Sequence, residues 1–126
     1  MQTNEQNKEA ALQFLKMVIA GKIDDAYRKY VSLQGKHHNA FFPAGFPALR
    51  EAMKENHEQS PKKQFKVMHV LGDGDLVAVH SHLVLRPGDP GMITVHLFRF
   101  KNDKIVEFWD CGQAISSSPP NSDGVF

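Results

Sequence analysis

The chain has 126 residues, of which 41% are hydrophobic and 23% are charged, as expected for a single globular domain. Its formal net charge is +1, without the basic surplus typical of nucleic-acid-binding proteins. No apolar stretch approaches the roughly 20 residues that span a bilayer, and the polar N-terminus lacks the pattern of a signal peptide. Cys111 is the single cysteine, which fits a reducing compartment. Together these features predict a soluble cytoplasmic protein without a nucleic-acid or membrane partner.

The first half of the chain predicts three helices. Apolar residues at spacings of three and four indicate a helix over Asn4–Ala20, which Gly21 ends. A short second helix follows over Ile23–Tyr30, and a third over Pro47–Gln59 begins at its proline. Between them, residues 32–45 read as irregular.

Beyond Pro61 the apolar residues alternate, and this pattern predicts strands. The four predicted strands are Gln64–Leu71, Leu76–Arg86, Met92–Lys101 and Ile105–Gln113. Helices followed by an antiparallel meander predict an α+β fold, in which helices cover one face of a curved sheet and close a pocket. We expect one domain over residues 1–115 and a flexible C-terminal tail over residues 116–126, which is rich in turn-forming residues.

The last predicted strand carries Asp110, the leading candidate for a catalytic residue. Because side chains alternate along a strand, Phe108 and Asp110 share one face while Glu107 and Trp109 share the other. If the Asp110 face looks into an apolar pocket, the buried carboxyl is suited to proton transfer near neutral pH. The alternative is a strand-end aspartate that is hydrogen-bonded to backbone or to an arginine.

Histidines are the next candidates. His80 shares a strand face with His82, and alternation alone does not decide whether that face lines the pocket or faces solvent or a second copy. His96 lies on the strand before that of Asp110. A tight turn at Asn102-Asp103 places His96 opposite Cys111 or Trp109, with Asp110 adjacent, unless a bulge intervenes.

The irregular segment adds His38 as a further candidate, with the neighbouring His37 expected to be exposed. Histidines also raise the alternative of a metal site, in which His80 and His82 are joined by His38 or His96, but no tight ligand spacing favours it. The predicted site therefore holds no metal. Five aromatic residues are candidates for binding a small hydrophobic molecule: Tyr30, Phe41, Phe42, Phe98 and Phe108.

In order and spacing, several motifs resemble the SnoaL-like polyketide cyclase group of the NTF2-like superfamily. They occur at Gly21–Val31, His38-Asn39, Gly45–Leu49, Gly74–His80, Phe98-Arg99 and Lys104–Gln113. The resemblance implies a cone-shaped α+β fold, a homodimer paired through its sheet, and a pocket aspartate that works without metal or organic cofactor. It also implies that the segment with His38 and Asn39 rims or enters the pocket. Two positions depart from the family pattern: Phe108 stands where a histidine is frequent, and His96 where an aspartate is frequent.

Two kinds of function remain open at this point. One is a metal-free aldol-type cyclase, isomerase or dehydratase that acts on a small hydrophobic carbonyl compound. Asp110 would be its acid and base, with His38, His80 and His96 as its polar partners. The other is a small-molecule-binding or scaffold protein without catalysis, which the loss of a polar residue at Phe108 favours.

Overall fold

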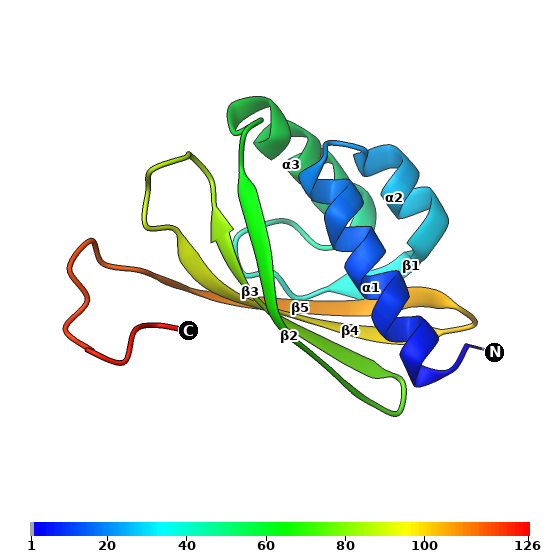
Figure 1. Cartoon of the computed structure of the whole chain (residues 1–126). Coiled ribbons are helices and arrows are strands. Elements are labelled where there is room, and N and C mark those ends of the chain that lie inside the picture. The colour runs from blue at the N-terminus through cyan, green and yellow to red at the C-terminus, as the bar shows by residue number, and fades with distance from the viewer. Residues whose placement is uncertain (1) are drawn as a thin grey trace.

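The computed structural model describes residues 2–126, and within them three helices cover one face of a five-stranded sheet (Figure 1). The helices are α1 (Asn4–Ile19), α2 (Ile23–Tyr30) and α3 (Phe46–Gln59). Each agrees with its predicted range to within one residue. Thr3 begins α1 with a capping box, in which its side chain accepts a hydrogen bond from the backbone of Gln6 and the side chain of Gln6 accepts one in return.

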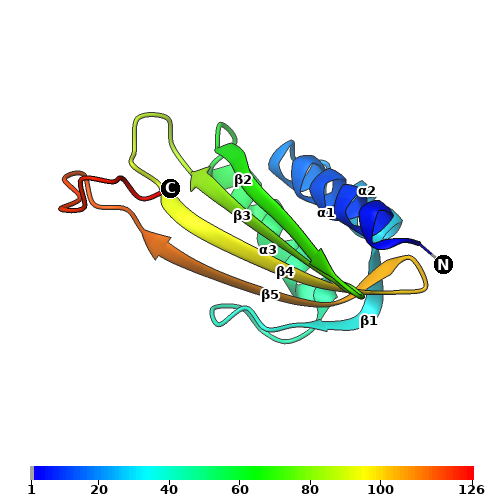
Figure 2. The same cartoon turned by 60° about the horizontal axis from the view of Figure 1, so that its bottom comes forward.

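The sheet confirms the predicted α+β class. Its strands are β1 (Val31–His37), β2 (Gln64–Asp73), β3 (Leu76–Val84), β4 (Met92–Lys101) and β5 (Lys104–Ala114). They lie in the order β1-β5-β4-β3-β2, with β1 parallel to β5 and every other pair antiparallel. Figure 2 shows the long strands curving around the helices, so that the inner face of the sheet and the helices enclose the core.

Strand β1 corrects the prediction that residues 32–45 are irregular. It pairs with β5 through Val31 opposite Ile105 and His37 opposite Phe108. Its sequence has few apolar residues, so alternation gave no signal, and its parallel partner lies far along the chain. Gly35 allows the close approach: a Cβ at this position would collide with the carbonyl oxygen of Val106 and the ring of Phe46.

A bulge in the β4–β5 hairpin sets the register at its inner face. Asn102 and Asp103 form a tight turn with φ values of 50° and 66°, and Lys101 pairs with Lys104 as predicted. The register then shifts by one between Arg99 and Phe100. As a result, His96 lies directly opposite Asp110, where an unbulged hairpin would have placed Trp109.

Among residues 2–126, no helix is both long enough and apolar enough to cross a membrane. After β5 the chain forms no further helix or strand, and the ring of its last residue, Phe126, packs at a tilt against His80 and His82 on the outer face of the sheet. The flexibility of the tail stays a prediction.

Candidate active site

A small cavity of about 60 Å³ lies between the helices and the inner face of the sheet. Helices α1, α2 and α3 and strands β1, β4 and β5 all contribute to its wall. Its apolar lining consists of Phe14, Leu15, Val18, Val31, Phe46, Leu49, Met53, Phe98, Ile105 and Phe108. Only three of its lining residues carry a hydroxyl, imidazole or carboxyl group, namely Tyr27, His96 and Asp110. A ligand in this cavity would therefore meet hydrogen-bonding and proton-transferring groups at one place in an otherwise apolar wall.

Asp110 is held by Asn39, which sequence reasoning had not identified as a site residue. The side-chain amide of Asn39 donates to both carboxylate oxygens of Asp110, over 2.9 Å to Oδ1 and 2.8 Å to Oδ2. The carboxylate keeps further lone pairs for a proton or a ligand, because each oxygen can accept more than one hydrogen bond. This contact fixes the orientation of the carboxylate at the cavity wall.

Asn39 is in turn positioned by its own loop. Its side-chain oxygen accepts from the backbone N–H of Phe41 over 2.8 Å, and its backbone N–H donates to His37 Nδ1 over 3.1 Å. His37 Nδ1 is then the acceptor nitrogen, so Nε2 carries the proton and donates to the carbonyl oxygen of Pro43 over 2.7 Å. The expectation that His37 is exposed is wrong: only 6% of it is accessible.

His96 faces Asp110 across the hairpin and is packed among aromatic rings. Its imidazole stacks on Phe98 and Phe108 at centroid distances of 6.3 Å and 5.7 Å, and Phe65 meets it edge-on at 6.0 Å. Burial lowers the pKa of His96 to about 4, although the negative charge of Asp110 opposes the shift. At neutral pH the ring is therefore uncharged. Its Nδ1 is buried and has no hydrogen-bond partner among residues 2–126.

Tyr27 supplies a second neutral group. It comes from α2, is 2% exposed and lines the cavity. Burial raises the pKa of its phenol well above the ordinary value, and the charge of Asp110 adds to the rise, while Arg50 opposes it. The hydroxyl thus keeps its proton at any physiological pH. From the sequence, Tyr27 was indistinguishable from an ordinary core residue on the buried side of a helix.

The predicted aromatic residues divide into two groups. Phe98 and Phe108 line the cavity and pack against each other, with their ring centroids 5.1 Å apart. Phe41 is 89% exposed, Phe42 is 37% exposed, and Tyr30 packs at the edge of the core, so none of these three lines the cavity. The loop turns outward after Asn39, which carries both phenylalanines away from the interior.

His38 and His80 do not join Asp110 either. His38 Nε2 lies 2.7 Å from Glu107 Oε2, and its ring stacks on Trp109 at 5.2 Å, so it belongs to the outer face of the sheet. This contact also lowers the pKa of Glu107. His80 is on the outer face of β3, where its Nδ1 lies 3.0 Å from that of His69. The inner face of β3 instead carries the buried side chains of Val77, Val79 and Ser81.

The histidines are too scattered to form a ligand set in this fold. Within the described part of the chain, no three His, Cys, Asp or Glu side chains are grouped so that they could hold a metal ion. His80 and His82, which the metal alternative required, lie on the opposite face of the sheet from His96.

The model of the SnoaL-like domain family matches residues 11–108. The chain belongs to the SnoaL-like domain family. This match begins within α1 and ends within β5. It includes Asn39, His96 and Phe108, whereas Asp110 lies two residues beyond its end. The comparison with curated proteins gave no match.

Solved structures confirm the NTF2-like fold of this SnoaL-like protein. A SnoaL-like protein of unknown function from Burkholderia thailandensis superposes with a TM-score of 0.74 at 15% identity, covering 89% of this chain and 98% of the other. An NTF2-like protein of unknown function from Burkholderia xenovorans gives 0.73 at 20% identity, covering 92% and 89%. IdmH from Streptomyces antibioticus, a proposed polyketide cyclase, gives 0.68 at 17% identity, covering 85% and 91%. At these identities the likeness establishes the fold and not the reaction.

Proposed function

We propose that this SnoaL-like protein is a cofactor-independent enzyme that moves a proton next to the carbonyl group of a small hydrophobic compound. The observation that carries the proposal is the pairing of Asp110 and a neutral His96 across the hairpin at the wall of an apolar cavity. A carboxylate and an uncharged hydrogen-bond donor at one spot are the groups that enolisation needs.

In the proposed reaction, the carboxylate of Asp110 accepts a proton from the carbon beside the carbonyl. The electron pair of that C–H bond forms the carbon–carbon double bond of an enolate, and the carbonyl π electrons move to its oxygen. His96 and Tyr27, both neutral, donate hydrogen bonds to this oxygen. The buried, unpartnered Nδ1 of His96 supports this role, because the substrate oxygen would supply the partner that it lacks.

The enolate has two fates that need no cofactor. Return of the proton from Asp110 to a different carbon of the substrate gives an isomer. Attack of the enolate carbon on a second carbonyl of the same molecule closes a ring, and the resulting alkoxide takes up the proton. The resemblance of IdmH, a proposed polyketide cyclase, is compatible with the second outcome.

Binding without catalysis is the second candidate, and the size of the cavity favours it. About 60 Å³ holds one or two water molecules, well below the roughly 300 Å³ typical of a ligand pocket. A protein that binds a small apolar group there, with Asp110 engaged by Asn39, would need no proton transfer.

Exchange of hydrogen for deuterium separates the two candidates. Cyclic ketones, β-diketones and β,γ-unsaturated ketones are incubated with the protein in D₂O, and loss of the proton signal next to the carbonyl is followed by NMR. The proposal predicts exchange that Asp110→Asn slows by about 100-fold or more, the range of a general base. Asp89→Asn, in the exposed loop after β3, is the matched control. Equal exchange by wild type and Asp110→Asn would exclude the acid–base role.

Two further expectations belong to this proposal. The resemblance to the family favours a homodimer, which the mass in light scattering would reveal. The exposed free thiol of Cys111 suits a reducing cytoplasmic setting.

A further inference from the structure

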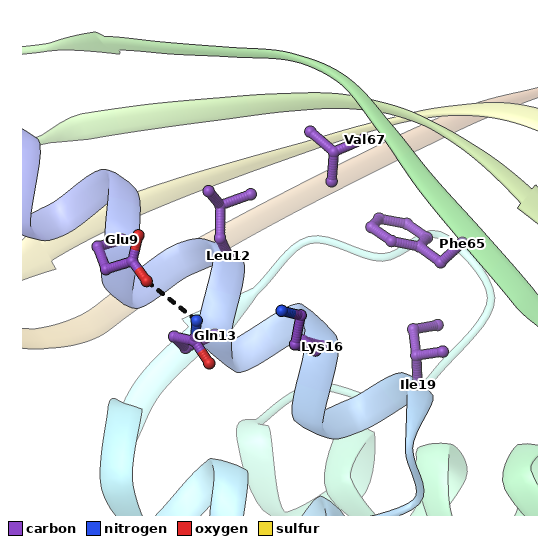
Figure 3. A pocket seen from close by; sticks show the side chains of 7 residues that line it. All are labelled: Glu9, Leu12, Gln13, Lys16, Ile19, Phe65 and Val67. Atoms are coloured by element: carbon purple, nitrogen blue, oxygen red, sulfur yellow. Dashed lines mark hydrogen bonds between the residues drawn. The ribbon is translucent and has the colours of Figure 1, made fainter.

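The substrate of the proposed reaction needs more room than the cavity provides. A groove of about 370 Å³ lies beside it, between α1 and the edge strand β2 (Figure 3). This volume falls within the range of small-molecule sites, whereas the cavity of about 60 Å³ does not. The cavity would then hold only the reacting end of a substrate, and the remainder would lie elsewhere.

The groove has an apolar floor. Leu12 and Ile19 from α1 face Phe65 and Val67 from β2, as Figure 3 shows. At one end Glu9 accepts a hydrogen bond from Gln13 over 3.0 Å, so these two polar groups satisfy each other. An apolar chain is therefore the part of a ligand that fits along the middle of the groove.

Phe65 separates the groove from the candidate active site. Its ring lines the groove, and its edge meets the imidazole of His96 at 6.0 Å. His96 in turn lines the cavity. Helix α1 borders both spaces, with Leu12 and Ile19 in the groove and Leu15 and Val18 in the cavity. Phe65 and α1 therefore lie between the two spaces, next to the group proposed to bind the carbonyl oxygen.

The lining of the groove carries two charged side chains, the carboxylate of Glu9 at one end and the ammonium group of Lys16. Lys16 is its basic side chain. It is exposed on the groove side of α1, and among residues 2–126 no carboxylate forms an ion pair with it. By contrast, Lys8 on the same helix pairs with Glu5 at 2.8 Å. The side chain of Lys16 can lie along an apolar ligand while its ammonium group binds an anion at the rim.

We propose that the groove binds the body of the substrate and that the substrate is an elongated apolar carboxylate. Its carboxylate pairs with Lys16, its apolar chain lies along Leu12, Ile19 and Val67, and its carbonyl end passes Phe65 to reach His96. This inference rests on the proposed function, because it takes the ligand of the groove to be the substrate of the Asp110 site.

Competition for an apolar anionic dye tests the inference. The dye is 1-anilinonaphthalene-8-sulfonate, and its displacement by decanoate and by the neutral ketone decan-2-one is read from fluorescence. Val67→Asp puts a charge on the groove floor and is expected to weaken both competitors by about tenfold or more. Lys16→Met is expected to weaken decanoate about fivefold and to leave decan-2-one unchanged.

Matched controls lie on the same strand outside the groove. Lys66→Met and Leu71→Asp change similar side chains of β2 and are expected to bind both competitors as wild type does. The inference is overturned if these controls weaken binding as much as the groove variants do. It is also overturned if Lys16→Met affects decanoate and decan-2-one equally. Lys16→Met keeps the test decisive should Val67→Asp fail to fold.

Two further measurements connect the groove with the candidate active site and distinguish the groove proposal from the proposed function. Decanoate binding is expected to shift the ring NMR signals of His96 and leave those of His82 on the outer face unchanged; the reverse would contradict the path past Phe65. Asp110→Asn is expected to bind decanoate as wild type does. If Asp110→Asn loses deuterium exchange but still binds decanoate, the result concerns the role of Asp110. If the wild-type protein catalyses exchange but does not bind decanoate in the groove, only the groove proposal is refuted.

Discussion

The chemistry proposed for Asp110 depends on the few side chains that surround it. Asn39 fixes the carboxylate through one amide group, and His96 and Tyr27 are held uncharged by burial. The sequence identified Asp110 and His96 through strand alternation. Alternation could not identify Asn39, because its contact with Asp110 spans 71 residues of chain and depends on a loop conformation. The only signal for Asn39 was its place in the His38-Asn39 motif of the family resemblance. From the sequence we expected His38 in the site and His37 at the surface, and the structure reverses the two. Nothing local in the sequence indicates which side of the sheet a loop residue joins.

Asn39→Ala tests the positioning role of the amide. The substitution removes both hydrogen bonds to Asp110 and frees the carboxylate to rotate, so we expect deuterium exchange to slow by about tenfold. The free energy of unfolding should fall by about 1.5–3 kcal/mol, the range for hydrogen bonds to a charged group. Both are measured against Asn121→Ala, a change in the C-terminal tail.

A slower exchange with an unchanged KM would mark a loss of positioning rather than of binding. Exchange at the wild-type rate would show that Asp110 needs no support from Asn39.

At the scale of elements, one bulge and one glycine build the site. The register shift between Arg99 and Phe100 turns the β4–β5 hairpin so that His96 and Asp110 meet. Gly35 lets β1 lie against β5, and this pairing delivers the following loop to the carboxylate. Alternation and turn signals predicted the antiparallel strands well. They missed β1 and the bulge, because parallel pairing and a one-residue shift depend on tertiary contacts.

Gly35→Ala should therefore disturb both the sheet and the site. The added methyl group meets the backbone of Val106 and the ring of Phe46, and the backbone cannot retreat without loosening β1. Overpacking of this kind costs about 1–3 kcal/mol of unfolding free energy, measurable by urea denaturation. Ser32→Ala, in the same strand, serves as the control. Wild-type stability of Gly35→Ala would mean that β1 does not pack as described.

At the scale of the whole molecule, the fold holds an uncharged imidazole inside an aromatic core. His96 has a pKa of about 4 in the folded protein and an ordinary value near 6.5 when unfolded. Below about pH 6.5 the unfolded chain takes up a proton that the folded chain does not. The contribution of the neutral ring to the free energy of unfolding is therefore fully present above pH 6.5, and it decreases as the pH falls towards 4.

Urea denaturation at several pH values checks this linkage. Between about pH 7 and pH 4.5 we expect His96 to account for a loss of about 2 kcal/mol of unfolding free energy. His96→Phe, a ring of similar size among aromatic neighbours, should remove that part of the pH dependence. A variant with the full wild-type slope would show that the loss arises from other groups.

The central claim is that Asp110 transfers a proton to and from an enolate, and binding of an enolate mimic tests it most directly. After proton transfer Asp110 is neutral and the substrate oxygen is negative. Asp110→Asn reproduces the neutral carboxyl and removes its repulsion of an oxyanion. The account predicts that 2-naphthol, followed by its fluorescence, binds Asp110→Asn about tenfold more tightly than it binds wild type or Asp89→Asn. Equal or weaker binding by Asp110→Asn would contradict the account.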